Sequence, residues 1–99
     1  MFPRIAALFI AFVTLCAHVR ADTPAEKLLK QPDDWFTSDK GRDALESILS
    51  WQSEHGDWPK NTDTTRQRRD EGSRRPAGTF DNGATTGELR VLARAFRIT

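Results

Sequence analysis

A run of small, mostly polar residues precedes the last amphipathic stretch of the chain and reads Asp81-Asn82-Gly83-Ala84-Thr85-Thr86. Asp81 offers a carboxylate, the kind of oxygen ligand that calcium prefers. Asn82 and Thr85 offer neutral hydrogen-bonding groups, and the free N–H groups of a following helix would attract an anion. The run could therefore hold an acidic substrate, directly or through a bridging metal. The same residue types also cap helices and form glycine turns, and taken alone they favour that structural role.

A second unusual string, Gly56-Asp57-Trp58-Pro59-Lys60-Asn61, lies some twenty residues earlier. Trp58 suits either a stacking platform for a sugar ring or a buried aromatic position. Lys60 suits either an ion pair with a substrate carboxylate or a solvated surface position. Each motif taken alone favours the structural alternative. Because the two motifs flank one loop between two predicted helices, they could meet at the same end of a helical pair.

The first predicted helix begins near Asp39, with Thr37 or Ser38 as its N-cap. Helical spacing of apolar residues defines its buried stripe, which comprises Ala44, Leu45, Ile48, Leu49 and Trp51. We expect His55 in its last turn and Gly56 just past its end. Before it, the adjacent aromatics Trp35 and Phe36 are typical of a packing anchor, and residues 25–30 suit one or two helical turns.

The second predicted helix runs from about residue 83 to residue 97. Its apolar stripe comprises Leu89, Leu92, Ala93 and Phe96. Asp81 or Asn82 could cap it, but Thr85 and Glu88 also have the spacing of a capping box. Arg90 and Arg94 are typical of ordinary helix positions. The intervening residues 62–79 are polar and mix arginines with acids, which is typical of a solvated loop; we expect no nucleic-acid partner.

The first residues are typical of a signal peptide. Arg4 precedes an apolar run over residues 5–17, and Val19-Arg20-Ala21 offers a small-x-small cleavage site before Asp22. A membrane anchor is the alternative, but the run is shorter than the ~20 apolar residues of a bilayer span. Cleavage after Ala21 would remove the single cysteine and two of the 15 basic residues, leaving a slightly acidic chain. We therefore expect a secreted or periplasmic protein with no stable membrane anchor and no disulfides.

Together the two motifs make the chain resemble the N-terminal part of the pectic acid lyase family, the family 10 polysaccharide lyases. That family has a Leu/Ile-rich helix, a G-G-W-P-K-N-type turn, a variable polar loop and a D-N-G-A-T-T segment leading into a helix like L-R-x-L-A-R. Here residues 56–61, 81–86 and 89–94 follow the same order over about residues 35–96. Asp57 departs from the usual second glycine, which puts the local turn in question.

The resemblance implies an all-α fold, a helical fragment of an α/α toroid (an incomplete barrel). It implies β-elimination of polygalacturonate or pectin, with calcium engaging the uronate carboxylates and an arginine removing the C5 proton. Asp81 matches the aspartate of the motif and is the expected calcium ligand. Lys60, Asn61, Asn82 and Thr85 match neighbouring motif positions and are the expected substrate-binding residues. No residue of this chain is assigned as the catalytic base.

We therefore predict three parts: a signal peptide over residues 1–21, a polar lead-in over residues 22–34, and the N-terminal part of a pectate-lyase-like catalytic domain over residues 35–99. The family's catalytic domain is several-fold longer, so this reading predicts a truncated and catalytically inactive chain. The alternative is a small secreted helical module that binds uronates or a protein partner without catalysis.

Overall fold

The computed structural model describes residues 21–72 and 76–99, so most of the predicted signal segment lies outside the described residues. The described part is helical and contains no β-strand, with one isolated antiparallel bridge between Trp58 and Thr79. The elements in chain order are α2 (Pro24–Lys27), 3₁₀ helices over Leu28–Lys30 and Asp33–Thr37, α3 (Asp39–Ser50), a 3₁₀ turn over Asp81–Gly83, and α4 (Thr86–Ile98). Within these ranges, no helix is long and apolar enough to cross a membrane.

Helix α3 begins where the sequence predicts and ends earlier. Ser38 caps it, because its Oγ accepts a hydrogen bond from the Gly41 N–H at 3.1 Å. The predicted C-terminus at His55 and Gly56 is wrong, because the helix stops at Ser50 and both residues lie in a separate turn. That turn is closed by Ser53, whose N–H donates to the Asp57 carbonyl at 2.8 Å. Gly56 still has a positive φ of 89°, which explains the glycine.

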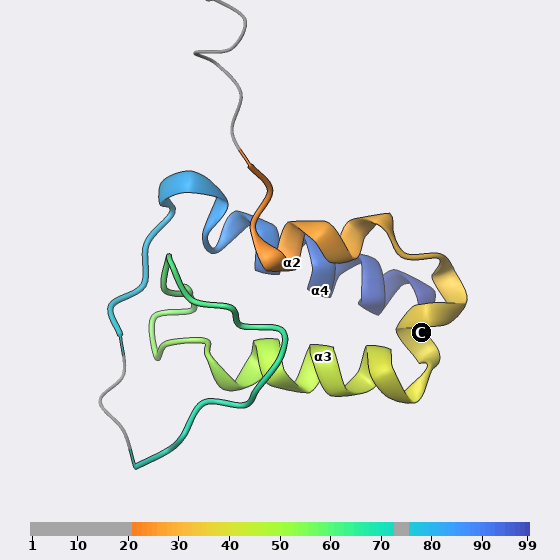
Figure 1. The fold of residues 1–99 in the computed structure, drawn as a ribbon, viewed down its shortest axis with the longest axis horizontal. Coiled ribbons are helices and arrows are strands. Elements are labelled where there is room, and N and C mark those ends of the chain that lie inside the picture. Colours follow the sequence, from red (N-terminus) through yellow and green to blue (C-terminus); the bar gives the residue numbers. More distant parts are fainter. Residues whose placement is uncertain (1–20, 73–75) are drawn as a thin grey trace, which may run out of the picture.

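Helix α2 and the 3₁₀ helix after it pack against α4, and the two segments lie side by side in Figure 1. Thr23 and Glu26 form a capping box that starts α2, with N···O distances of 3.1 and 3.0 Å. Ala25, at 1% exposed, joins the core. A Cβ on Gly87 would come within 2.9 Å of the Glu26 Cγ, so the glycine permits the close approach of α2 and α4. The predicted polar lead-in is therefore part of the folded unit.

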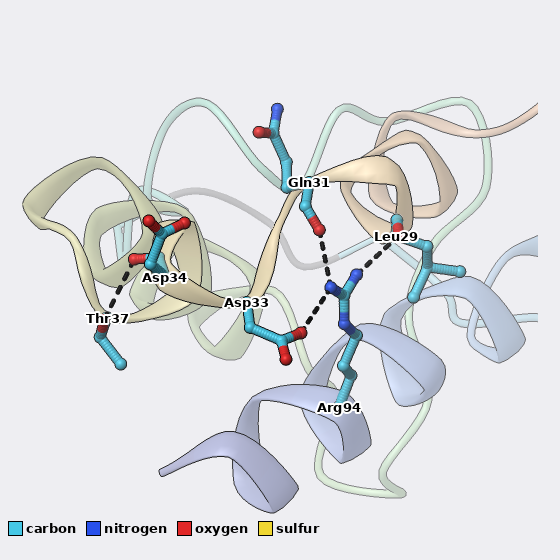
Figure 2. Close-up of polar contacts among 6 residues, drawn as sticks. All are labelled: Leu29, Gln31, Asp33, Asp34, Thr37 and Arg94. Atoms are coloured by element: carbon cyan, nitrogen blue, oxygen red, sulfur yellow. Dashed lines mark hydrogen bonds and ion pairs between the residues drawn. The ribbon is translucent and has the colours of Figure 1, made fainter.

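Arg94 on α4 joins the lead-in to the rest of the fold (Figure 2). Its guanidinium donates to the carbonyl oxygens of Leu29 and Gln31 at 2.6 and 2.7 Å and pairs with the Asp33 carboxylate at 2.9 Å. Its Cζ also lies 4.5 Å from the centroid of the buried Phe36 ring. The prediction that Arg94 is an ordinary helix position is wrong, because its planar fork satisfies backbone carbonyls that a sequence pattern does not show.

The core gathers one or two side chains each from α2, the 3₁₀ helix over Asp33–Thr37, α3, the loop at Trp58 and α4. Its buried members are Ala25, Phe36, Ile48, Trp58, Val91 and Ala95. Trp35 meets Phe36 edge-on at 5.1 Å between ring centroids, which confirms the predicted packing anchor. The predicted apolar stripe of α4 is wrong: Leu89 and Phe96 are 45% and 85% exposed, and Val91 and Ala95 form the buried face.

Candidate functional site

The two motifs singled out in the sequence lie side by side. The Thr79 N–H donates to the Trp58 carbonyl at 2.9 Å, which forms the bridge. The Thr85 hydroxyl links the same two loop segments. It accepts from the Trp58 N–H at 2.8 Å and donates to the Thr79 carbonyl at 2.7 Å. Trp58 itself is buried, with its indole N–H donating to the Ile48 carbonyl at 2.8 Å. It is therefore the core aromatic and not an exposed stacking platform.

Lys60 and Asp81, one from each motif, form an ion pair with 2.8 Å between Nζ and Oδ2. Both side chains are about half exposed, at 44% and 54%. The hydrogen bond and the positive charge of Lys60 hold the pKa of the Asp81 carboxyl below its ordinary value. The ionised form of Asp81 is thus favoured, and the pair lies where a ligand in solution can reach it.

Asn61 and Asn82 are exposed beside this pair, and each has a left-handed backbone, with φ of 59° and 53°. Asparagine tolerates this conformation better than most residues with a side chain. Asn82 lies inside the 3₁₀ turn over Asp81–Gly83, which pushes the start of α4 to Thr86. The predicted start near residue 83 is therefore wrong. Thr85 occupies the N-cap position, but its side chain makes no capping hydrogen bond because the hydroxyl is engaged with the Trp58–Thr79 bridge.

A pocket of about 370 Å³ opens between the start of α2, the loop over residues 59–64 and the first turn of α4. Its lining residues are Ala21, Asp22, Thr23, Pro24, Ala25, Pro59, Lys60, Asn61, Thr62, Asp63, Thr64, Asn82, Ala84 and Glu88. Three of the five predicted site residues, Lys60, Asn61 and Asn82, are among them. Asp81 holds Lys60 from outside the lining. Thr85 is absent from the lining, and its buried hydroxyl is engaged with Trp58 and Thr79, so it supports the site and does not face a ligand.

The family model for pectic acid lyase matches residues 52–99. This stretch, the pectic acid lyase-like region, is similar to part of that family. The match includes both motifs and the whole of α4, whereas the sequence resemblance was expected to extend back to about residue 35. No curated protein and no solved structure was found to match the chain.

Two parts of the pocket wall were missed by the sequence interpretation. One is the start of the lead-in, from Ala21 to Ala25. The Thr23 to Glu26 spacing of a capping box, followed by an apolar residue two positions later, is the signal that could have indicated a packed helix there. The other is Glu88, which the sequence suggested only as a capping partner of Thr85.

Glu88 is the buried carboxyl of the site. It is 3% exposed, and its Oε2 has no hydrogen-bond partner among the described residues. Burial raises the pKa of the Glu88 carboxyl above its ordinary value, and the nearby Glu26 carboxylate raises it further. Backbone N–H groups of Glu88 and Thr85 offset part of this effect. The site therefore combines the half-exposed ammonium of Lys60 with a buried carboxyl in its wall whose pKa is raised.

Calcium requires six to eight oxygen ligands and several carboxylates to neutralise it. The predicted ligand Asp81 already accepts a hydrogen bond from the Lys60 ammonium, and no cluster of three or more potential metal-ligating side chains occurs in residues 21–72 and 76–99. These residues do not by themselves fit a resident calcium ion.

Proposed function

We propose that the pectic acid lyase-like region binds the uronate units of a galacturonate polymer, such as polygalacturonate or pectin, with Lys60 as the group that contacts the carboxylate. The observation that carries the proposal is the ion pair between Lys60 and Asp81, since it shows a carboxylate held by this lysine at the mouth of the pocket. The match of residues 52–99 to the pectic acid lyase family supports an acidic polysaccharide as the ligand class.

Asp81 is a positioning residue in this proposal. Exposed ion pairs are weak, because water screens both charges and ordering two side chains costs entropy. A uronate carboxylate can therefore replace the Asp81 carboxylate beside Lys60 at little cost. Asn61 and Asn82 then offer amide donors and acceptors to the sugar hydroxyls from the same pocket wall.

The β-elimination of the family requires a base that removes the C5 proton, together with neutralisation of the adjacent carboxylate. Lys60 can supply the neutralising charge. The described lining of the pocket contains no arginine, and the guanidinium of Arg94 is hydrogen-bonded to the Leu29 and Gln31 carbonyls. We therefore propose binding without cleavage by this chain, and export through the predicted signal segment to the place where such polymers occur. Incubation with polygalacturonate should release no unsaturated uronides by ultraviolet absorbance, with or without calcium.

Titration calorimetry with trigalacturonate tests the binding proposal, and the matched neutral trisaccharide of galactose is the control ligand. We expect heat with the acidic trisaccharide only, weakening as salt is added because the contact is ionic. Equal affinity for both trisaccharides would show that Lys60 does not recognise the uronate carboxylate. Running each titration with and without calcium also tests the expected cofactor: binding that appears only with calcium would favour metal-bridged recognition at Asp81.

A further inference from the structure

Glu88 is the one carboxyl of the pocket wall that the proposed function leaves unexplained. The other two acids of the lining have partners: Asp22 pairs with Lys30 at 3.7 Å, and Asp63 accepts from the Thr65 N–H at 2.9 Å. Glu88 instead has a buried oxygen, Oε2, without a hydrogen-bond partner in the described residues. A buried polar atom of this kind is rare in folded proteins and is usually satisfied by a group the protein does not supply, such as water or a ligand.

The close contact between α2 and α4 buries this carboxyl. Gly87 lets the first turn of α4 approach the start of α2 so closely that the Glu26 side chain lies beside that turn. Burial and the negative charge of Glu26 both disfavour ionised Glu88. A neutral carboxyl is a donor through its O–H and an acceptor through its carbonyl oxygen, which complements a sugar hydroxyl.

We propose that the Glu88 carboxyl is a further ligand-binding group of the pocket, which donates a hydrogen bond to a hydroxyl of the sugar whose carboxylate Lys60 contacts. This inference rests on the proposed function and deepens it. Lys60 would recognise the charge of the uronate and Glu88 the hydroxyl pattern of the same ring. A pocket of about 370 Å³ is at the small end of ligand-sized pockets, which suits one sugar unit better than a long segment of chain.

The electrostatic surroundings give the proposal a distinctive pH dependence. The charged groups around Glu88 are Glu26 of α2, which acts on it through its charge, and Asp22, Lys60 and Asp63, which line the same pocket. As the pH rises through the raised pKa of Glu88, the carboxyl loses its donor proton and becomes a second negative charge near a uronate that is ionised throughout. Affinity for trigalacturonate should then fall.

The test is titration calorimetry of the full chain with trigalacturonate, from mildly acidic to mildly alkaline pH, for wild type, E88A and E88Q. E54A serves as the control, since the Glu54 side chain is 87% exposed and outside the pocket lining. At mildly acidic pH we expect E88A to lose roughly 3- to 10-fold in affinity, the value of about one neutral hydrogen bond, and E54A to lose none. E88Q keeps a donor and an acceptor, so it should stay within about twofold of wild type and lose the pH-dependent fall.

The failures of the two proposals can be told apart. If wild type does not bind trigalacturonate, both fall. If wild type binds but a folded E88A binds equally well, only the role of Glu88 is removed. Should E88A fail to fold, E88Q decides: a pH profile identical to that of wild type overturns the role of Glu88, and a flat profile with retained affinity supports it.

Discussion

The Thr85 hydroxyl lies 2.8 Å from the backbone nitrogen of Trp58, a residue 27 positions earlier, and so joins the two sequence motifs. Its second hydrogen bond, to the Thr79 carbonyl, fixes the loop that carries Asp81. Thr85 also has a positive φ of 67°, an unfavourable conformation for a β-branched residue, and these hydrogen bonds offset its cost. The relationship explains how Lys60 and Asp81 come to lie side by side.

Replacing Thr85 by Val should therefore destabilise the fold by about 1–3 kcal/mol, since it leaves a buried N–H and a carbonyl unsatisfied. T85S, which keeps the hydroxyl, should retain most of the stability. Urea unfolding followed by circular dichroism measures the difference. The neighbouring exposed Thr86 is the control, and T86V should change stability by less than about 0.5 kcal/mol. Equal losses for T85V and T85S would show that the hydroxyl is not what joins the motifs.

Arg94 should be required for the order of the lead-in. R94A removes the donors to the Leu29 and Gln31 carbonyls. The segment over residues 25–31 should then separate from α4 more easily, which lowers the free energy of unfolding by about 1–3 kcal/mol. R94K should recover little, because an ammonium cannot reproduce the planar fork. Hydrogen exchange of the amides over residues 25–31 reports the effect. The exposed Arg90 provides the control, and similar protection in R94A and R90A would contradict the assignment.

Glu88 should make the fold more stable under mildly acidic than under neutral conditions. Its folded pKa is raised, so the folded state binds more protons than the unfolded state. This contribution is fully present below the ordinary pKa of a glutamate and is lost as the pH rises through the folded pKa. E88Q does not titrate, so it should remove that slope. The lowered pKa of Asp81 acts in the opposite direction and at lower pH, so the difference between wild type and E88Q isolates Glu88.

Local patterns predicted much of this fold. The apolar spacing and the Ser38 cap located α3, and adjacent aromatics identified Phe36 as a packing anchor. The ends of the helices could not be predicted as well from the sequence. His55 and Gly56 have the residue types of a helix end, but they lie in a local turn closed by the hydrogen bond from the Ser53 N–H to the Asp57 carbonyl, which runs opposite to a helical bond. The late start of α4 depends on the left-handed Asn82 and on a tertiary use of the Thr85 hydroxyl.

The candidate site divides in the same way. Lys60, Asn61 and Asn82 were identified from motif positions and line one pocket. Asp81 was expected to bind metal, a role that stays a prediction, and the structure pairs it with Lys60. Glu88 could not be recognised from sequence, because its burial arises from the close contact of α2 and α4 at Gly87. Such contacts between distant segments are invisible to helical periodicity.

The central claim, that Lys60 binds the uronate and Asp81 only positions it, is tested most directly by calcium-free calorimetry of K60M and D81N with trigalacturonate. We predict that K60M loses about tenfold or more in affinity, since a charge-assisted hydrogen bond is lost. D81N, which frees Lys60 from its internal partner, should bind at least as tightly as wild type. Unchanged binding by K60M together with loss of binding by D81N would contradict the account.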